Sequence, residues 1–435
     1  MGGYTMPLWN APFESMPRES LNKVQLQRLK AVIERAASLS PFYKQRFAET
    51  GVHAEKIRSL EDLSTLPFTT KDDLRFHYPW GLCTVSLKET VRIHTSSGTT
   101  GKPVVAAYTR ADLAVWTEVC ARSLTAAGVA PGDVVHNSYG YGLFTGGLGI
   151  QLGAEAIGAT VVPASSGFTA RQLMLLEDFG ATVLTCTPSY ALVLGEEATA
   201  AGTMLKLRVG IFGAEPWSEE MRREIHDALH LEPYDIYGLT EIIGPGVAME
   251  CEQHDGLHVF EDHFYPEIID PSSGQPQDFG VEGELVFTTL TKEAMPLIRY
   301  RTGDRTILHQ DKCACGRTLA RMGKVLGRTD DMLIVRGVNV FPSQVEKVLL
   351  EFDEVAPQYQ IIIDRKRHEL DSFEVLVEGL DSFDRTFGVE LEGKIQKRLL
   401  DALLIHCKVT VMKPRGLERS AGKAVRVLDR RKLSL

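Results

Sequence analysis

The chain has 435 residues, of which 44% are hydrophobic and 24% are charged, and its formal net charge is −9. A chain of this length is expected to form two or three domains, and its composition is that of a soluble globular protein. Its acidity disfavours binding to nucleic acid or to an anionic membrane, and no apolar segment approaches the ~20 residues of a membrane-spanning helix.

The first residues, 1–13, lack the cationic lead-in of a signal peptide, so we expect a cytoplasmic protein. The first predicted element is an amphipathic helix over residues 20–37, where apolar side chains recur at helical spacing. Farther along, continuous apolar strands alternate with amphipathic helices, a pattern typical of a sheet covered on both faces. The expected strands are 91–95, 104–108, 133–138, 160–163, 182–186 and 207–212, and the expected helices are 111–127, 145–157, 170–179 and one capped by Ser218.

The pattern changes after about residue 245, where short strands joined by turns predict a small β-rich module. A last region, beginning near residue 332, is expected to form a compact α+β domain with strands 358–364 and 374–378 and helices 343–352 and 389–404. The predicted fold class is therefore α/β. It comprises a large N-terminal domain of covered mixed sheets plus the small β-module, residues 1–327, followed by a small α+β C-terminal domain, residues 328–435.

The strongest local motif is the segment 95–103, which reads Thr-Ser-Ser-Gly-Thr-Thr-Gly-Lys-Pro. Its glycines permit tight turns that bring backbone N–H groups close to an anion, and its hydroxyls and lysine add donors. It is not a Walker A loop, which has glycine at the position of Ser96 and serine or threonine at the position of Pro103. A polar hairpin turn is the alternative, but the composition favours a phosphate-binding loop. The expected contacts are Ser96, Ser97, Gly98, Thr99, Thr100, Gly101 and Lys102.

A second motif, residues 235–241, reads Asp-Ile-Tyr-Gly-Leu-Thr-Glu and is expected just past a strand. Tyr237 is suited to stack on a base, Thr240 to donate to a phosphate and Glu241 to hold Mg²⁺. Asp304, in the segment 300–304, is suited to accept hydrogen bonds from two ribose hydroxyls. An ordinary helix start or a charged turn is the alternative for each motif taken alone.

The motifs carry more information as a set. In chain order they are the loop 95–103, Tyr-Gly-Leu-Thr-Glu, Tyr-Arg-Thr-Gly-Asp, Gly-Arg-Thr-Asp-Asp with Gly337 downstream, and a terminal Gly-Lys that ends at Lys423. This set resembles, over nearly the whole chain, the core motifs of the adenylate-forming superfamily of acyl-CoA synthetases, peptide-synthetase adenylation domains and luciferases. Within that superfamily the chain looks most like phenylacetate-CoA ligases, on residues 139–147, 261–264 and 336–342.

The resemblance implies a ligase that uses ATP, Mg²⁺ and coenzyme A to convert an aromatic carboxylic acid to an acyl-adenylate and then to a CoA thioester. Lys423 would neutralise charge on the carboxylate and the α-phosphate, and Thr240 and Glu241 would complete the catalytic set. Asp304 would bind the ribose, and Arg328 would approach the ribose or a phosphate. The other residues expected at the nucleotide are Gly213, Ala214, Glu215, Pro216, Asp235, Ile236, Tyr237 and Gly238.

The resemblance also implies that the C-terminal domain is mobile. Asp330 matches the hinge about which that domain rotates between the two reactions. After the rotation, Gly337 would line the route of the pantetheine arm, where a bulky side chain would not fit.

The acid is expected near a glycine-rich stretch that contains three aromatic residues. Aromatic rings among glycines can form a flat apolar slot for an aryl ring. Ordinary core packing at the start of a helix is the alternative. The expected substrate contacts are Tyr139, Tyr141, Phe144, Gly146 and Ala214.

The seven cysteines are an odd number in a large chain, so a disulfide framework is not expected. Cys313 and Cys315 form a pair on a turn, with Cys251 and His258 upstream. Three cysteines and one histidine match a closed, structural zinc site. His254 competes with His258 for the fourth position, and free surface thiols are the alternative to a metal site.

Four questions stay open at this point. The acceptor is free CoA or the phosphopantetheine of a carrier protein, and the sequence does not separate the two. The alternative from another functional class is a non-catalytic scaffold that binds zinc. The presence of Lys423, Glu241 and Asp304 argues against it. The identity of the aromatic acid and the oligomeric state, for which a homodimer is one expectation, are not determined.

Overall fold

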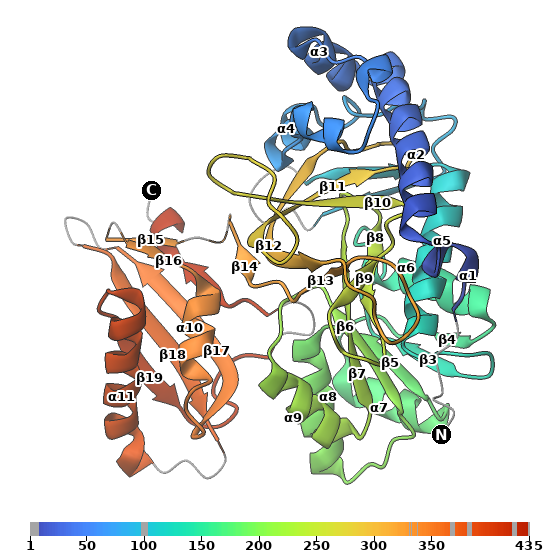
Figure 1. Cartoon of the computed structure of the whole chain (residues 1–435). Coiled ribbons are helices and arrows are strands. Elements are labelled where there is room, and N and C mark those ends of the chain that lie inside the picture. Colours follow the sequence, from blue (N-terminus) through green and yellow to red (C-terminus); the bar gives the residue numbers. More distant parts are fainter. Residues whose placement is uncertain are drawn as a thin grey trace. The chain divides into compact units, whose positions relative to one another are not determined.

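The structure is a computed structural model that describes residues 8–96, 103–329, 331, 333–336, 338–365, 370–380, 385–419 and 424–433. It divides into two compact units (Figure 1). The first comprises Met1–Ala214 and Ile225–Lys324, and the second comprises Glu215–Glu224 and Val325–Leu435. Among the described residues, no helix is both long and apolar enough to cross a membrane.

One hydrogen-bonded series of strands runs through the first unit. Its members are β3 (Val134–Asn137), β4 (Thr160–Val162), β5 (Val183–Cys186), β6 (Val209–Gly213), β7 (Glu232–Leu239), β8 (Gly244–Glu250), β9 (Leu257–Val259), β10 (Phe264–Ile269), β11 (Glu282–Thr289), β12 (Tyr300–His309) and β13 (Arg321–Met322). Their spatial order is β10-β11-β12-β13-β9-β8-β7-β6-β5-β3-β4. The strands from β4 to β7 pair in parallel, and those from β7 to β10 pair antiparallel. The β-rich segment expected after residue 245 therefore extends the main sheet.

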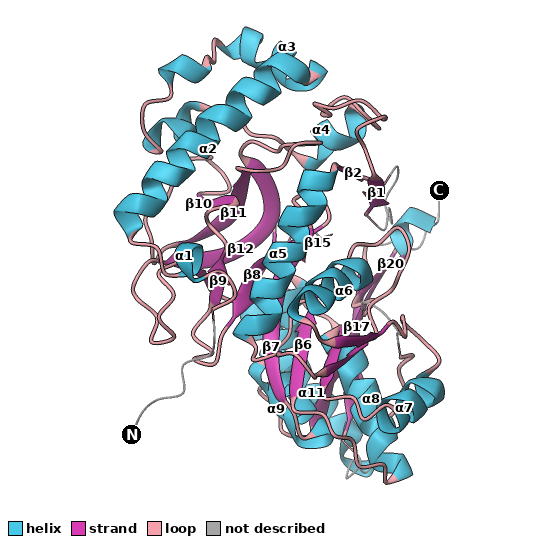
Figure 2. Cartoon of the chain, turned by 90° about the vertical axis from the view of Figure 1, so that its right-hand side faces the viewer, coloured by secondary structure: helices cyan, strands magenta, loops and turns pink. Residues whose placement is uncertain are grey.

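Helices accompany this sheet. They are α1 (Ala11–Glu14), α2 (Arg18–Leu39), α3 (Pro41–Thr50), α4 (Lys71–Phe76), α5 (Arg110–Ala126), α6 (Gly146–Ile157), α7 (Thr169–Asp178), α8 (Pro188–Ala201) and α9 (Glu219–Leu229), with short 3₁₀ turns at Ala54–Lys56 and Glu61–Thr65. Helix α5 packs on α6 and on β8 (Figure 2). It begins with a capping box in which Thr109 and Asp112 exchange side chain–backbone hydrogen bonds, which satisfies free N–H groups of its first turn. The predicted cap of α9 is confirmed, because the Met221 N–H donates to Ser218 Oγ (3.1 Å).

A two-stranded hairpin carries the ends of the predicted phosphate loop. Its strands are β1 (Arg92–Thr95) and β2 (Val105–Tyr108), which match the two predicted strands and pair antiparallel. The Ser96 N–H donates to Val104 O (2.9 Å), and the Val104 N–H donates to Ser96 Oγ (3.0 Å). These two bonds close the base of the loop.

The second unit is the expected α+β domain. Its sheet has the order β19-β18-β17-β20, and α11 packs on β19 and on α10. The elements are β14 (Gly327–Arg328), β15 (Leu333–Val335), β16 (Val338–Val340), α10 (Pro342–Leu349), β17 (Val355–Asp364), β18 (Ser372–Gly379), α11 (Arg385–Leu403), β19 (Lys408–Met412), β20 (Val427–Asp429) and a 3₁₀ turn at Arg430–Leu433.

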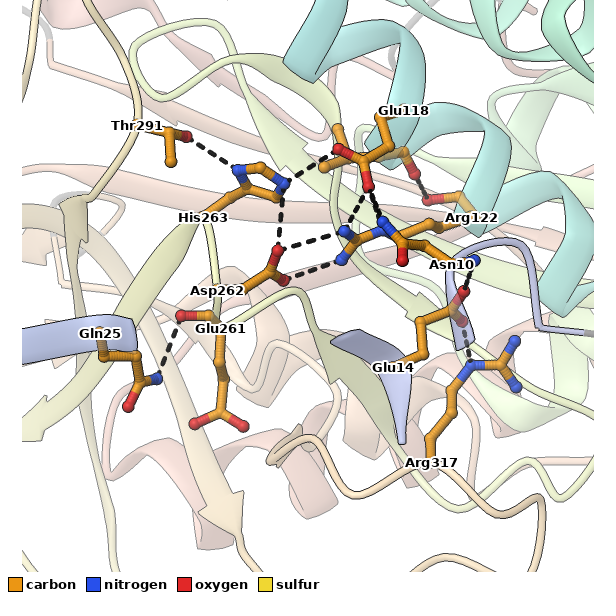
Figure 3. A network of polar contacts seen from close by, with 12 residues as sticks. Asn10, Glu14, Gln25, Glu118, Arg122, Glu261, Asp262, His263, Thr291 and Arg317 are labelled. Carbon is orange, nitrogen blue, oxygen red and sulfur yellow. Dashed lines mark hydrogen bonds and ion pairs between the residues drawn. The ribbon is translucent and has the colours of Figure 1, made fainter. Parts of the chain in front are cut away.

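A buried ionic network fixes α5 against the start of β10 (Figure 3). Arg122 and Asp262, both with fully buried side chains, form a bidentate pair at 2.8 and 3.1 Å. Arg122 also binds Glu118, and His263 Nε2 lies 3.2 Å from carboxylate oxygens of both Glu118 and Asp262. On its other side, His263 Nδ1 lies 2.8 Å from Thr291 Oγ1. Part of the segment 261–264, which carries the closer resemblance, is thus structural.

The predicted α/β class with a large first and a small second domain is confirmed. The elements that lack a counterpart in the prediction include α1, α8, β16, β19 and β20. Tyr237 and Gly238 lie within β7, whereas their motif was expected just past a strand. The segment 300–304 begins the long strand β12, so the alternative of a charged turn is wrong for it.

Candidate active site

A hydrogen bond between neighbouring motifs marks the predicted nucleotide site. Tyr237, in β7, donates its hydroxyl to Asp304 Oδ2, in β12, over 2.6 Å. The Asp304 side chain is mostly buried, and the Tyr237 ring lies 6.3 Å from that of Phe287. The structure thus brings together the residues predicted for base stacking and for ribose binding, from strands that lie 67 residues apart in sequence.

Two glycines are required by the close approach of the strands here. A Cβ at Gly213, the last residue of β6, would lie 2.1 Å from Ile236 O. A Cβ at Gly238 would lie 2.0 Å from Gly244 O. Both distances are too short for any other residue, so these positions serve backbone packing. Ala214, which follows β6, has a left-handed φ of 72°, a conformation that is strained for alanine and typical of functional sites.

Thr240 and Glu241 form the turn that joins β7 to β8. Both side chains are largely buried. Thr240 Oγ1 lies 3.3 Å from Thr145 Oγ1, at the start of α6, and Glu241 Oε1 lies 4.0 Å from the ammonium of Lys71. The turn therefore places the Thr240 hydroxyl beside the N-terminus of α6 and the Glu241 carboxylate near Lys71, the first residue of α4. A carboxylate oxygen is the ligand type that Mg²⁺ prefers.

The predicted acid-binding aromatics gather around that helix N-terminus. A Cβ at Gly146 would lie 2.7 Å from the ring of Phe144 and 3.2 Å from that of Tyr139, which is buried. A Cβ at Gly147 would lie 2.9 Å from the ring of Tyr141. The three rings therefore depend on the absence of side chains at the first two positions of the helix. Burial raises the pKa of Tyr141 to about 12, so its hydroxyl stays neutral.

Asn137, which the sequence did not single out, holds this aromatic stretch in place. Its Nδ2 donates to Tyr141 Oη (2.9 Å) and to Gly147 O (2.8 Å), and its Oδ1 accepts from Thr185 Oγ1 (2.9 Å). It is the last residue of β3 and is fully buried. A buried asparagine at the carboxyl end of a strand is the signal in the sequence that would have found it.

The remaining predicted nucleotide and hinge residues are placed as follows. Asp235 and Ile236 lie in β7, and Arg328 lies in β14 of the second unit. Glu215 and Pro216 follow Ala214 and are grouped with the second unit. The predictions for Ser97, Gly98, Thr99, Thr100, Gly101, Lys102, Asp330, Gly337 and Lys423 lie outside the described residues.

The cysteine prediction concerns a separate site. The ligand atoms of Cys251, His258, Cys313 and Cys315 all lie within 4.8 Å of one another, and all four residues are buried. Cys251 Sγ is 3.7 Å from Cys313 Sγ, and Cys315 Sγ is 3.4 Å from His258 Nε2. A tetrahedral zinc ion with bonds of ~2.3 Å to sulfur and ~2.0 Å to nitrogen would give edges of roughly 3.8 and 3.5 Å. The residues therefore fit zinc.

Two alternatives for these residues are wrong. The cysteines are not surface thiols, since none has more than 8% of its surface exposed. His254 is not the fourth member, because its ring nitrogens lie 2.9 Å from Glu232 and 3.3 Å from Glu250. His258 is instead brought to the cluster by β9, which pairs with β13 just after the loop that holds Cys313 and Cys315.

Comparisons with known proteins agree with this arrangement. The family model of the AMP-binding enzyme matches residues 23–290, and that of the AMP-binding enzyme C-terminal domain matches residues 337–431. The phenylacetate-coenzyme A ligase of Thermus thermophilus is 50% identical over 98% of this chain and 100% of its own. Those of Pseudomonas putida and Escherichia coli are 48% and 47% identical, each over 97% of this chain and over 96% and 98% of their own.

Solved structures are similar over most of the chain as well. A 2-hydroxyisobutyryl-CoA ligase in the postadenylation state, in complex with 2-HIB-AMP, is 29% identical with a TM-score of 0.88, over 97% of this chain and 92% of its own. The same ligase in complex with 2-HIB-AMP and CoA, in the thioesterification state, has a TM-score of 0.72 over the same shares of the two chains.

Proposed function

The chain belongs to the AMP-binding enzyme family, and from this membership we propose that it is a phenylacetate-CoA ligase-like enzyme that acts on an aromatic carboxylic acid. The enzyme is an AMP-forming acid–CoA ligase that consumes ATP, an acid and CoA. The observation that carries the proposal is the 50% identity, over 98% of the chain, to a relative with this name. The structure supports the proposal in two places. The hydrogen-bonded pair Tyr237–Asp304 has residue types suited to a nucleotide, and the aromatic cluster around Gly146 has residue types suited to an aryl ring.

In the first reaction, the acid's carboxylate attacks the α-phosphorus of ATP, and pyrophosphate leaves with its electron pair. Asp304 accepts from the ribose hydroxyls, and the loop 96–102 donates to the phosphates. Thr240 would donate to a phosphate oxygen, and Glu241 would hold Mg²⁺, which would neutralise part of the phosphate charge. Lys423 bridges the two anions that must approach each other.

In the second reaction, the CoA thiolate attacks the acyl carbon and AMP leaves. We propose that residues 328–435 rotate as a domain against residues 1–327 between the two reactions, about Asp330, which removes Lys423 and admits CoA. Gly337 then lines the route of the pantetheine arm.

Gly337 offers a test of this second step. Gly337→Trp should lower the rate of thioester formation by ~10² or more while adenylation stays within about twofold, because an indole would fill the pantetheine route. The two rates are measured separately, by pyrophosphate release and by thioester formation from pre-formed acyl-AMP. Equal loss of both rates would argue against this assignment of Gly337.

The proposed substrate class rests on Tyr139, Tyr141 and Phe144, whose rings surround the start of α6. Phenylacetate, benzoate, substituted benzoates and indoleacetate all carry an aryl ring and a carboxylate. A panel of aromatic and aliphatic acids, tested by acid-dependent pyrophosphate release, identifies the substrate. If pyrophosphate were released with aliphatic acids but with none of the aromatic acids, the aromatic assignment would be overturned. Thioester formation with free CoA and no added protein separates this proposal from a carrier-protein acceptor.

We further propose that Cys251, His258, Cys313 and Cys315 hold a structural zinc ion. The support is the tetrahedral match of the sulfur–sulfur and sulfur–nitrogen distances. Four protein ligands leave no open position, so zinc would stabilise the fold and would take no part in the reaction.

A further inference from the structure

One lysine of the first unit is enclosed in the protein interior. Lys292 lies between β11 and β12 and has only 2% of its surface exposed. Its ammonium donates to Glu241 O (3.1 Å) and to Ile242 O (2.7 Å), and it lies 5.0 Å from the centre of the Tyr108 ring. Among the described residues, no carboxylate forms an ion pair with it. Its partners are therefore two carbonyls and an aromatic face.

Lys292 is one of two side chains that donate hydrogen bonds to the backbone carbonyls of the turn after β7. Tyr108 donates its hydroxyl to Ile243 O (3.0 Å), so Lys292 and Tyr108 together bind the carbonyls of residues 241, 242 and 243. Three successive buried carbonyls need donors, and within the described part of the chain these two side chains supply them. The turn that contains Glu241 therefore depends on these two side chains for its conformation.

The segment around Lys292 is itself firmly held. Thr291 binds His263 of the ionic network (Figure 3). The Glu293 N–H and the Ala294 N–H donate to the two carboxylate oxygens of Asp112, at 2.6 and 3.0 Å. Asp112 belongs to the capping box of α5 and is fully buried. The lysine thus extends from a backbone that is fixed on both sides.

Enclosing an ammonium is costly, which makes an ordinary packing role a poor explanation. The Lys292 ammonium is removed from water, and the two carbonyls and the Tyr108 ring are the groups that contact it. An apolar side chain of similar volume usually packs at lower cost than a buried cation. The cost of burying this cation therefore points to a role beyond the filling of space.

We propose that Lys292 is a positioning residue for adenylation, which fixes the turn that presents Thr240 and Glu241 to Mg²⁺–ATP. This inference rests on the proposed function. Lys292 touches neither substrate nor metal in this assignment, and it acts through the backbone of residues 241 and 242. Loss of its contacts would leave Glu241 in place but free to adopt other orientations, and the metal would then bind more weakly.

The test measures how adenylation depends on the concentration of Mg²⁺ and, without turnover, how tightly the protein with bound ATP binds Mn²⁺ as a spectroscopic probe for Mg²⁺. Both values should weaken to a similar degree in the Lys292→Met variant. Lys292→Met, which keeps the volume and removes the donors, should raise the Mg²⁺ concentration for half-maximal pyrophosphate exchange by ~10- to 100-fold, the usual effect of losing a residue that orients a metal ligand. Thioester formation from pre-formed acyl-AMP should stay within about threefold. Lys23→Met, the same change at an exposed lysine of α2, should alter neither value.

A second variant, Lys292→Gln, keeps the inference testable if Lys292→Met does not fold. Lys292→Gln keeps an NH₂ group that donates to carbonyls, and it should show a smaller increase in the Mg²⁺ requirement. An unchanged Mg²⁺ midpoint in folded Lys292→Met, or in Lys292→Gln if the former unfolds, would overturn the inference. Unfolding of both variants would also overturn it, by assigning Lys292 a structural role. A wild-type protein without acid-dependent exchange would instead refute the proposed function.

Discussion

Replacing Lys423 with alanine should slow acyl-AMP formation by ~10² or more, the scale of losing one charged group that stabilises a transition state. Adenylation brings the carboxylate of the acid next to the α-phosphate, and these two anions repel each other. A cation that bridges them acts mainly in the transition state, so its loss lowers the rate more than it weakens substrate binding. The rate is measured by acid-dependent exchange of labelled pyrophosphate into ATP.

The same variant separates the two reactions. If the C-terminal domain rotates and withdraws Lys423, the Lys423→Ala protein should convert pre-formed acyl-AMP to thioester at close to the wild-type rate. Lys394→Ala, which removes an exposed lysine of α11, should leave both reactions unchanged. Normal adenylation by Lys423→Ala would remove this residue from the catalytic set. Equal loss in both steps would contradict the rotation but not the assignment as a ligase.

Replacing Cys313 with serine should abolish zinc binding and lower the free energy of unfolding of the first unit by about 4 kcal/mol or more, the range in which loss of a metal site falls. The reason is that metal-binding free energy is gained only in the folded state, where strands β9 and β13 have brought His258 to the cysteines. Metal analysis of the purified protein and denaturant-induced unfolding measure the two effects, with about one zinc per chain expected in the wild type.

The matched control for this prediction is Cys83→Ser. Cys83 is a buried thiol outside the cluster, so the chemical change is the same. It should leave the zinc content unchanged and cost only ~1 kcal/mol, as for many point substitutions. A wild-type protein that contains no metal and is fully stable would refute the zinc proposal.

Residues that the sequence grouped together also lie together in the structure where a motif combines several chemical types within a few positions. Tyr237 and Asp304 were assigned to the same nucleotide, and the structure joins them by a hydrogen bond. The cysteine cluster was also predicted, but the choice between His254 and His258 was left open. That choice depends on the register in which β9 pairs with β13, which spacing along the chain does not reveal.

Other features were missed because their signals are not local. Lys292 reads as a lysine in an ordinary loop, and its two carbonyl partners lie 51 and 50 residues earlier in the chain. Asn137 is similarly tied to Thr185, 48 residues later. By contrast, the signals of α8 are present in the sequence, because Thr187 caps the helix and Pro188 occupies its first position. The apolar content of that helix on several sides hides its periodicity.

The contact between Glu14 and Arg317 has a consequence for the synthesis of the protein. Both side chains are fully buried, their bond joins residues 303 positions apart, and the Thr318 N–H donates to Glu14 O (3.0 Å) beside it. Glu14, the last residue of α1, therefore lacks these two partners until residues 317 and 318 have been synthesised. Until then, the segment around Glu14 stays exposed to solvent. Chaperones bind exposed segments of incomplete chains, and proteases cut them. Stalled chains that end before residue 317 should remain sensitive to protease near residue 14. Protection there in such chains would show that the contacts of Phe13 with Arg28 and Arg122 are enough to dock α1.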